Sequence, residues 1–417
     1  MPSSADLASI EAATDDLLDD SVAFLREMIR TPSVNPPGDY TEIHGFVTDE
    51  FEAFGWEVET MWAPEELLEE HGLEHPRPNV LAYVTRGEGP TIALNAHLDT
   101  VPVDETRWSY DPFEATVDDG RIWGRGAKDS KGRVAAYTLA ARALEEAELL
   151  PEDATIVLAI TADEETGGAA GPEYVVDSGR LDADYAIVEG DVDRVDYAAA
   201  GVFHFEVAVG GKSSHAGTSP EEGANALVGA SRIVSALEEY AERLKDERVS
   251  DVPGIGHATC VPATVEGGVK TNVVPPSCTL TVDRRILPEE DAEEVEREFR
   301  AVIDGVELPE GTSAEVEVLL QAQSYVSERD GPLVRSLKRN ADSITGSDVT
   351  VGGTRGFTDA RFFAHGGIET AKYGPGDGKS NVHGPDENVA IDQLRDAGAV
   401  VAATLLDLAE DAESASR

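Results

Sequence analysis

The sequence predicts an α/β protein with a mainly parallel mixed sheet flanked by helices, into which a smaller α+β domain is inserted. Three apolar runs, TIALNA (91–96), ATIVLAIT (154–161) and DYAIV (184–188), alternate with helical patterns, which is typical of βαβ units. From about residue 197 the pattern changes to alternating strands such as VFHFEVAV, which favour an antiparallel sheet.

A chain of 417 residues is long for one core, so two domains are expected. We predict a discontinuous catalytic domain over residues 1–196 and 323–417, and an inserted lid or dimerisation domain over 197–322. In the catalytic domain we expect helices ending near Arg30, over 43–54, after 132, from 331 and from 390. Further strands are expected at 57–63, 79–87 and 369–374.

The expected order of elements in the inserted domain is strand, helix, strand, strand, helix, strand, which is the order of a ferredoxin-like open sandwich. Its helices are predicted at 224–244 and 289–304. Its later strands are predicted at 257–268, 277–287 and 313–321. Cys260 and Cys278 lie in two of these strands and are expected to be reduced core residues.

The composition excludes some partners. The chain has 82 Asp and Glu against 33 Lys and Arg, a net charge of −49, which disfavours nucleic acid as a partner. Self-repulsion on this scale needs screening, so we expect a halophilic protein. With no secretory or membrane-spanning pattern, a cytoplasmic location is expected.

Candidate ligands follow the predicted parallel strands. His97 and Asp99 end the first strand, Glu164 and Glu165 follow the second, and Glu189 follows the third. The carboxyl ends of parallel strands meet at one edge of a sheet, so these side chains are expected to lie together. One histidine among several carboxylates indicates a divalent metal.

Two further positions come from loops. Asp129 stands at the start of the long Ala-rich helix, where an aspartate is most often an N-cap. The neighbouring glycines of GRGAKDSKG also suit a carboxylate held at a site. His383 lies in the irregular loop GPGDGKSNVHGPDENV, which is more typical of function than of packing.

Four co-linear motifs, NAHLDTVP, GRGAKDSKG, ADEETGG and NVHGPDENV, resemble those of the M20 metallopeptidase family. SVNPPG, TNVVPP and VDRRILP are similar to it as well. The branch that looks nearest comprises acetylornithine deacetylase and succinyl-diaminopimelate desuccinylase. The resemblance implies a zinc-peptidase-like catalytic domain with two zinc or cobalt ions.

Carried over by motif, the resemblance assigns roles to individual residues. His97 and Glu189 hold one metal, Glu165 and His383 hold the other, and Asp129 bridges them. Glu164 is the general base and Asp99 orients His97. The resemblance also assigns three residues of the inserted domain: His215 reaches the active site of a neighbouring subunit, and Asn272 with Arg285 holds the substrate carboxylate.

Two assignments stay open. Glu189 is followed by Gly190 and Asp191 instead of the branch's Pro-Thr or Pro-Ser, so Asp191 is an alternative ligand. Arg284 is an alternative to Arg285, which fits the Asp-x-Arg spacing better. The predicted helix 224–244 carries an apolar surface that we expect to pair with a second copy in a homodimer: Ala224, Ala226, Leu227, Gly229, Ile233, Val234 and Leu237.

The expected activity is hydrolysis of the amide bond of an N-acyl amino acid in amino-acid biosynthesis. Two metals activate a water, Glu164 accepts its proton, and a guanidinium and an amide hold the free carboxylate. A carboxypeptidase or dipeptidase with the same metal centre is the alternative. A non-catalytic scaffold is a remote one, because every ligand position holds a competent residue.

Overall fold

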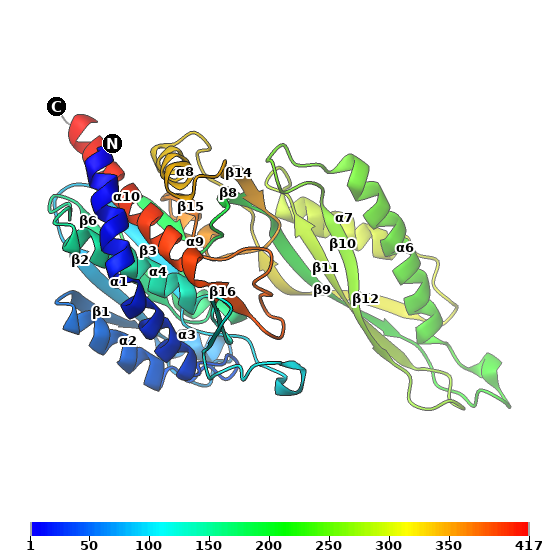
Figure 1. The fold of residues 1–417 in the computed structure, drawn as a ribbon. Helices are drawn as coiled ribbons and strands as arrows, with labels where there is room; N and C mark the ends of the chain where they lie inside the picture. The colour runs from blue at the N-terminus through cyan, green and yellow to red at the C-terminus, as the bar shows by residue number, and fades with distance from the viewer. Residues whose placement is uncertain (1, 416–417) are drawn as a thin grey trace. The chain divides into compact units, whose positions relative to one another are not determined.

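The computed structural model describes residues 2–415, which group into two compact units (Figure 1). The first comprises residues 2–197, Ser327–Val351 and 358–415. The second comprises Ala198–Val326 and Gly352–Phe357. Compared with the predicted insertion, the second unit also contains the short segment Gly352–Phe357.

The first unit is built on a sheet with the strand order β1-β2-β6-β3-β7-β15-β8. Its central strands β6, β3, β7 and β15 run parallel, whereas β1, β2 and β8 pair antiparallel with their neighbours. The predicted mixed sheet is therefore confirmed. The strands are β1 (Glu57–Trp62), β2 (Pro78–Thr85), β3 (Thr91–His97), β6 (Thr155–Thr161), β7 (Tyr185–Val188), β8 (Arg194–Ala199) and β15 (Glu369–Lys372).

Helices α1 (Ser4–Arg30), α4 (Lys131–Glu146) and α10 (Ile391–Ala415) pack against one another over this sheet (Figure 1). Every residue of β3 and β6 after the first is buried, which explains why both read as continuous apolar runs. The other α-helices and strands of the first unit are α2 (Thr41–Ala53), α3 (Glu65–Glu70), α5 (Tyr174–Asp177), α8 (Pro332–Thr345), α9 (Ala360–His365), β4 (Thr116–Asp118), β5 (Arg121–Trp123) and β16 (Asn388–Ala390). Two short strands also pair with β8: β13 (Tyr325–Val326), which belongs to the second unit, and β14 (Thr350–Thr354), which extends into it.

The start of α4 differs from the N-cap expected at Asp129. The helix begins at Lys131, its N-cap residue is Ser130, and no side chain caps it. The Asp129 carboxylate instead accepts a 2.8 Å hydrogen bond from Arg133 Nη1, one turn further along the helix. A charged donor binds a carboxylate more strongly than a backbone amide does, so the capping prediction was wrong here.

The second unit has the predicted order β9 (Gly201–Gly210), α6 (Ala226–Glu247), β10 (Thr259–Gly267), β11 (Ser277–Ile286), α7 (Ala292–Asp304), β12 (Ser313–Ala322). Its sheet runs β10-β11-β9-β12, with every neighbouring pair antiparallel. Cys260 and Cys278 are buried and free, as predicted.

Most of the apolar face of α6 is covered by the sheet of its own unit. Ile233 and Leu237 are fully buried, because α6 packs on β9, β10 and β11 of its own unit. A Cβ atom at Gly229 would lie 3.0 Å from Val209 Cγ1, so this glycine permits a close approach of the helix to the sheet. The predicted pairing surface was therefore wrong for the residues that are buried in this way, because their pattern marks the core of the unit. Leu227 and Val228 of this helix remain exposed, at 45% and 42%.

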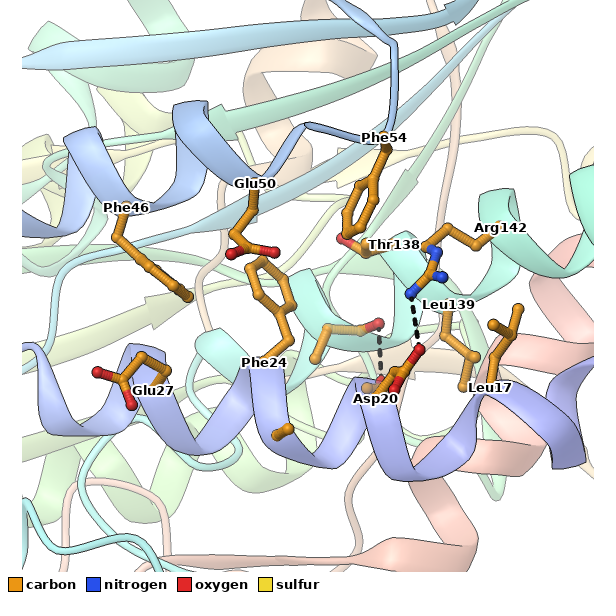
Figure 2. Close-up of a pocket in the computed structure, with 13 residues that line it drawn as sticks. Leu17, Asp20, Phe24, Glu27, Phe46, Glu50, Phe54, Thr138, Leu139 and Arg142 are labelled. Carbon is orange, nitrogen blue, oxygen red and sulfur yellow. Dashed lines mark hydrogen bonds and ion pairs between the residues drawn. The ribbon is translucent and has the colours of Figure 1, made fainter. Parts of the chain in front are cut away.

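A groove of about 370 Å³ lies between α1, α2 and α4 (Figure 2). Phenylalanine rings at positions 24, 46 and 54 line it, together with acidic side chains and Arg142. The guanidinium of Arg142 lies 3.6 Å from Asp20 and over the ring of Phe54, so both partners hold it on the surface of α4.

Among residues 2–415, no helix is long and apolar enough to cross a membrane.

Candidate metal centre

The parallel strands deliver the predicted ligands to one edge of the sheet. His97 is the last residue of β3 and pairs in register with Thr161, the last residue of β6. Glu164 and Glu165 follow in a 3-10 turn, and Glu189 follows the last residue of β7. This is the carboxyl edge, where ligands of such sheets bind.

Two histidines define two poles that share Asp129. His97 Nε2 lies 3.5 Å from Asp129 Oδ1 and 3.5 Å from Glu189 Oε2. We call this group of His97, Asp129 and Glu189 the first pole. His383 Nε2 lies 3.3 Å from Asp129 Oδ2 and 3.2 Å from Glu165 Oε2. We call this group of His383, Asp129 and Glu165 the second pole. Asp129 thus presents one oxygen to each histidine, the arrangement needed of a bridging ligand.

The donor atoms at the poles fit a divalent metal. Among the described residues, His97 Nε2, Glu189 Oε2 and the other oxygen of the Glu165 carboxylate, Oε1, are buried without a hydrogen-bond partner, although buried polar atoms are normally satisfied. Ligand atoms of His97, Asp129 and Glu165 all lie within 4.8 Å of one another. Imidazole and carboxylate donors at such spacing suit a divalent metal ion.

Asp99 holds the other side of the His97 ring. His97 Nδ1 lies 3.0 Å from the Asp99 backbone oxygen and 3.3 Å from Asp99 Oδ1. The Asp99 carboxylate also accepts hydrogen bonds from Asn35 Nδ2 at 2.9 Å and from the Glu165 backbone at 3.1 Å. Burial raises the pKa of Asp99, but its contact with His97 and these bonds outweigh burial and lower it. Nδ1 therefore carries the proton and Nε2 faces the first pole.

Glu164 lies beside the first pole, with Oε2 3.9 Å from His97 Nε2. Burial, and next the neighbouring carboxylate of Asp359, raises the pKa of Glu164 well above its usual value. A carboxylate with a raised pKa next to a metal site suits a general base. Asp359 was not anticipated from the sequence; it is 1% exposed, and neither of its carboxylate oxygens has a hydrogen-bond partner within residues 2–415.

Glu189 and Asp191, the two candidates for the ligand after β7, have different contacts. Asp191 Oδ1 pairs with Lys128 Nζ at 2.6 Å, whereas Glu189 reaches the first pole and accepts a 3.0 Å hydrogen bond from Thr358 Oγ1. A Cβ atom at Gly190 would lie 2.4 Å from the backbone nitrogen of Tyr373, so only glycine fits there. These contacts account for the Gly-Asp departure from the family pattern and favour Glu189 as the ligand.

A second residue that sequence reasoning missed is Glu387. Its buried carboxylate accepts hydrogen bonds from the backbone nitrogens of Gly126, Lys128 and Asp129, at 2.9–3.2 Å. It also pairs with Arg125 at 2.6 Å. Glu387 therefore ties the loop that carries Asp129 to the loop that carries His383. Its only signal was its place in the motif NVHGPDENV.

The predicted residues of the second unit lie in two places. His215 and Asn272 are exposed on neighbouring loops, joined by a 3.0 Å bond from the Ala216 nitrogen to the Asn272 oxygen. His215 Nδ1 accepts from the backbone nitrogens of Gly217 and Thr218, which makes Nε2 the proton-bearing nitrogen. These two bonds hold the imidazole ring within its own loop and leave Nε2 free to donate.

The two arginines differ in accessibility. Arg284 is fully buried and pairs with Glu290 at 2.6 Å, so its guanidinium is committed to the core. Arg285 is partly exposed on β11, where it pairs with Asp283 at 3.0 Å. Arg285 is therefore the one of the two that a ligand can reach.

Two histidine–carboxylate poles that share one aspartate, at the carboxyl edge of the parallel strands, suit a metal-dependent hydrolase. A profile of peptidase family M20/M25/M40 matches residues 93–407, and the chain belongs to this family.

Relatives in the family act on different substrates. The chain is 27% identical over 393 residues to a succinyl-diaminopimelate desuccinylase of Psychrobacter arcticus, covering 90% of each chain. It is 30% identical over 295 residues to aminoacylase-1 of Sus scrofa, covering 67% of this chain and 69% of that one. The structure of an M20 family metallo-carboxypeptidase from Sulfolobus solfataricus has a TM-score of 0.78 at 19% identity, over 94% of this chain and 99% of that one.

Proposed function

We propose that this hydrolase cleaves the amide bond of N-acyl amino acids, of the acetylornithine or succinyl-diaminopimelate type, with Glu164 as general base. The observation that carries the proposal is the bridging position of Asp129 between the two poles, with the carboxylate of Glu164 3.9 Å from His97 Nε2. The desuccinylase and aminoacylase relatives, which share this amide chemistry, support the substrate class.

Two divalent ions, zinc or cobalt, fit the donor set. The first would be held by His97, Glu189 and Asp129, and the second by His383, Glu165 and Asp129. Such ions, when bound, polarise the amide carbonyl and lower the pKa of the hydrolytic water.

The chain's own residues manage the proton. Glu164 Oε2 accepts the proton of the attacking water and then donates it to the leaving amine nitrogen, so the carboxylate is regenerated as the amide bond breaks. Asp99 keeps the proton of His97 on Nδ1. Thr358 donates to Glu189 Oε1 and leaves Glu189 Oε2 facing the first pole.

We propose that the second unit acts as a lid domain, whose residues contact the bound substrate. His215, with its proton on Nε2, donates to the oxyanion of a neighbouring subunit's substrate in a homodimer. Asn272 and Arg285 hold the carboxylate of the substrate. A carboxypeptidase or dipeptidase activity is the alternative, because a peptide presents the same amide and free carboxylate.

The test is an assay of purified protein with Zn²⁺ or Co²⁺ in molar KCl. N-acetylornithine, N-succinyl-diaminopimelate, N-acetyl-lysine and a panel of dipeptides are offered in parallel. We expect hydrolysis of at least one N-acyl amino acid, with Glu164→Gln as the inactive control. Preferential cleavage of dipeptides would replace the proposal by the peptidase alternative, and no turnover of any substrate would refute both.

A further inference from the structure

Arg133 is a buried cation at the first pole that the proposed chemistry does not use. It stands in the first turn of α4, four residues after Asp129, and its side chain is 7% exposed. Its guanidinium is anchored by two 3.3 Å hydrogen bonds, from Nε and Nη2 to the Gly190 oxygen. A Cβ atom at Gly374 would lie 3.1 Å from Arg133 Cγ, so the absence of a side chain there makes room for it.

The remaining guanidinium nitrogen is directed at the first pole. Arg133 Nη1 lies 2.8 Å from Asp129 Oδ1 and 3.6 Å from Glu189 Oε2. These are the same two oxygens that lie 3.5 Å from His97 Nε2. The Asp129 oxygen that faces the second pole is Oδ2, which lies 3.3 Å from His383.

A permanent positive charge at these oxygens acts on a metal ion in three ways. It repels a metal ion bound to the same oxygens, because electrostatic repulsion between like charges is strong in a buried site. Its hydrogen bond also withdraws electron density from Asp129 Oδ1, which weakens that donor. Finally, the metal must share both oxygens with the guanidinium. All three effects weaken binding at the first pole.

The contribution of Arg133 to the positioning of the ligands is backed up by other contacts. Glu189 is also held by Thr358, and the backbone of Asp129 is held by Glu387. Removal of Arg133 therefore leaves the first pole assembled but without its built-in cation.

We infer that Arg133 makes the two metal positions unequal, so that the first pole binds its ion more weakly, fills last and loses its ion first. This inference rests on the proposed two-metal centre. The protein is then expected to retain one tightly held ion per chain after desalting, and to need added metal for full occupancy.

The test isolates each pole. His383→Ala disables the second pole and reports on the first, whereas His97→Ala disables the first and reports on the second. Arg133→Met and Arg133→Gln are introduced into each background, and Zn²⁺ affinity is measured by chelator competition in KCl. Gln keeps hydrogen-bond donors without charge, and circular dichroism confirms that each variant is folded.

With His383→Ala, both substitutions of Arg133 are expected to tighten Zn²⁺ binding at least about tenfold, within the range that residues next to metal ligands control. With His97→Ala, affinity is expected to stay within about twofold. Arg142→Met is the matched control, since Arg142 lies on the same helix but pairs with Asp20. It is expected to change neither affinity.

Unchanged or weaker binding at the first pole in both Arg133 variants would overturn the inference and leave the two-metal centre intact. Equal tightening in both backgrounds would also overturn it, because the effect would not be specific to one pole. Failure of the wild type to bind two Zn²⁺ ions would overturn the two-metal centre, and the inference with it.

Discussion

Glu164 and Glu165 are neighbours in the chain but face different surroundings. Glu165 Oε2 lies 3.2 Å from His383, whereas Glu164 lies beside His97 with a pKa raised by burial and by Asp359. We predict that Glu164→Gln keeps two metals and loses about 10²–10⁴-fold in kcat, because a base is removed but no ligand. Glu165→Gln should instead lower metal content at the second pole. Metal analysis with steady-state kinetics separates the two, and equal metal loss would show that their roles are confused.

The histidines set the pH dependence of metal binding. Hydrogen bonds to Asp129 and Glu165 raise the pKa of His383 to about 10 in the metal-free protein. Burial lowers the pKa of His97, but contacts with Asp129, Asp99 and Glu189 outweigh burial and raise it well above its usual value. A raised pKa means that each ring holds a proton at pH 7 that a metal must displace, so metal affinity falls as pH falls.

We therefore predict that Zn²⁺ binding to metal-free protein at pH 7 releases about two protons per chain from the rings. Calorimetry in buffers of different ionisation enthalpy measures this number. His383→Ala, which lacks one of the two rings, should release about one proton fewer. Binding with no proton release would contradict the prediction.

At the scale of elements, a buried ion pair supports the turn that carries both glutamates. Arg77 Nε lies 2.9 Å from Asp163 Oδ1, and both side chains are at most 2% exposed. Asp163 has a φ of +71°, a conformation that Asn tolerates well. Asn35 joins this pair to the site, since it lies 3.3 Å from Arg77 Nη2 and 2.9 Å from Asp99. The pair therefore stabilises the turn that precedes Glu164 and Glu165.

We predict that Arg77→Met and Asp163→Asn each cost about 3–5 kcal/mol of unfolding free energy, because each leaves a buried charge without its partner. The double variant should lose less than the sum, with a coupling of about 0.5–3 kcal/mol. Denaturant unfolding measures all three. The exposed pair Arg86–Glu57, 3.0 Å apart, is the control, and Arg86→Met should cost at most about 1 kcal/mol. Additive losses would mean that the buried pair does not act as a unit.

At the scale of the whole molecule, the net charge of −49 makes repulsion between acidic side chains the main electrostatic force on the folded chain. We propose that the fold is adapted to high salt, because self-repulsion on this scale must be screened. Circular dichroism during dialysis from molar KCl to dilute buffer should show loss of structure. An unchanged spectrum would refute the halophilic interpretation.

The reactivity of the two cysteines provides a second measure of unfolding at low salt. Cys260 is 3% and Cys278 1% exposed, and burial raises the pKa of the Cys260 thiol to about 12. A thiol reagent at pH 8 should therefore label neither cysteine in molar KCl and both after dialysis. Labelling of both in KCl would contradict the buried positions.

Subunit mixing tests the proposed action of His215 across a dimer. Inactive His215→Ala and inactive Glu164→Ala proteins are mixed and allowed to exchange subunits. If His215 serves the neighbouring site, each mixed dimer has one intact site, and random pairing restores about a quarter of wild-type sites. Activity that stays at zero after exchange would mean that His215 serves the site of its own subunit.

The sequence by itself determined the parallel centre of the sheet and the candidate ligands at its edge. His97, Glu164, Glu165 and Glu189 each follow an apolar run that is local in the chain, and parallel topology brings the ends of such runs together. The order of elements in the second unit followed in the same way from alternation and helical spacing.

Only the tertiary structure decided which way side chains turn and what covers them. Asp129 has the pattern of an N-cap, but it turns to Arg133 and to two histidines that lie 32 residues before it and 254 after it in the chain. The apolar stripe of α6 has the same spacing whether its own sheet or a second copy covers it. Arg77 and Arg133 carry no local signal, and Glu387 only its place in a motif, because each acts through partners set by packing. A sequence pattern identifies a face or a charge, whereas the partner depends on distances that exist only in the folded chain.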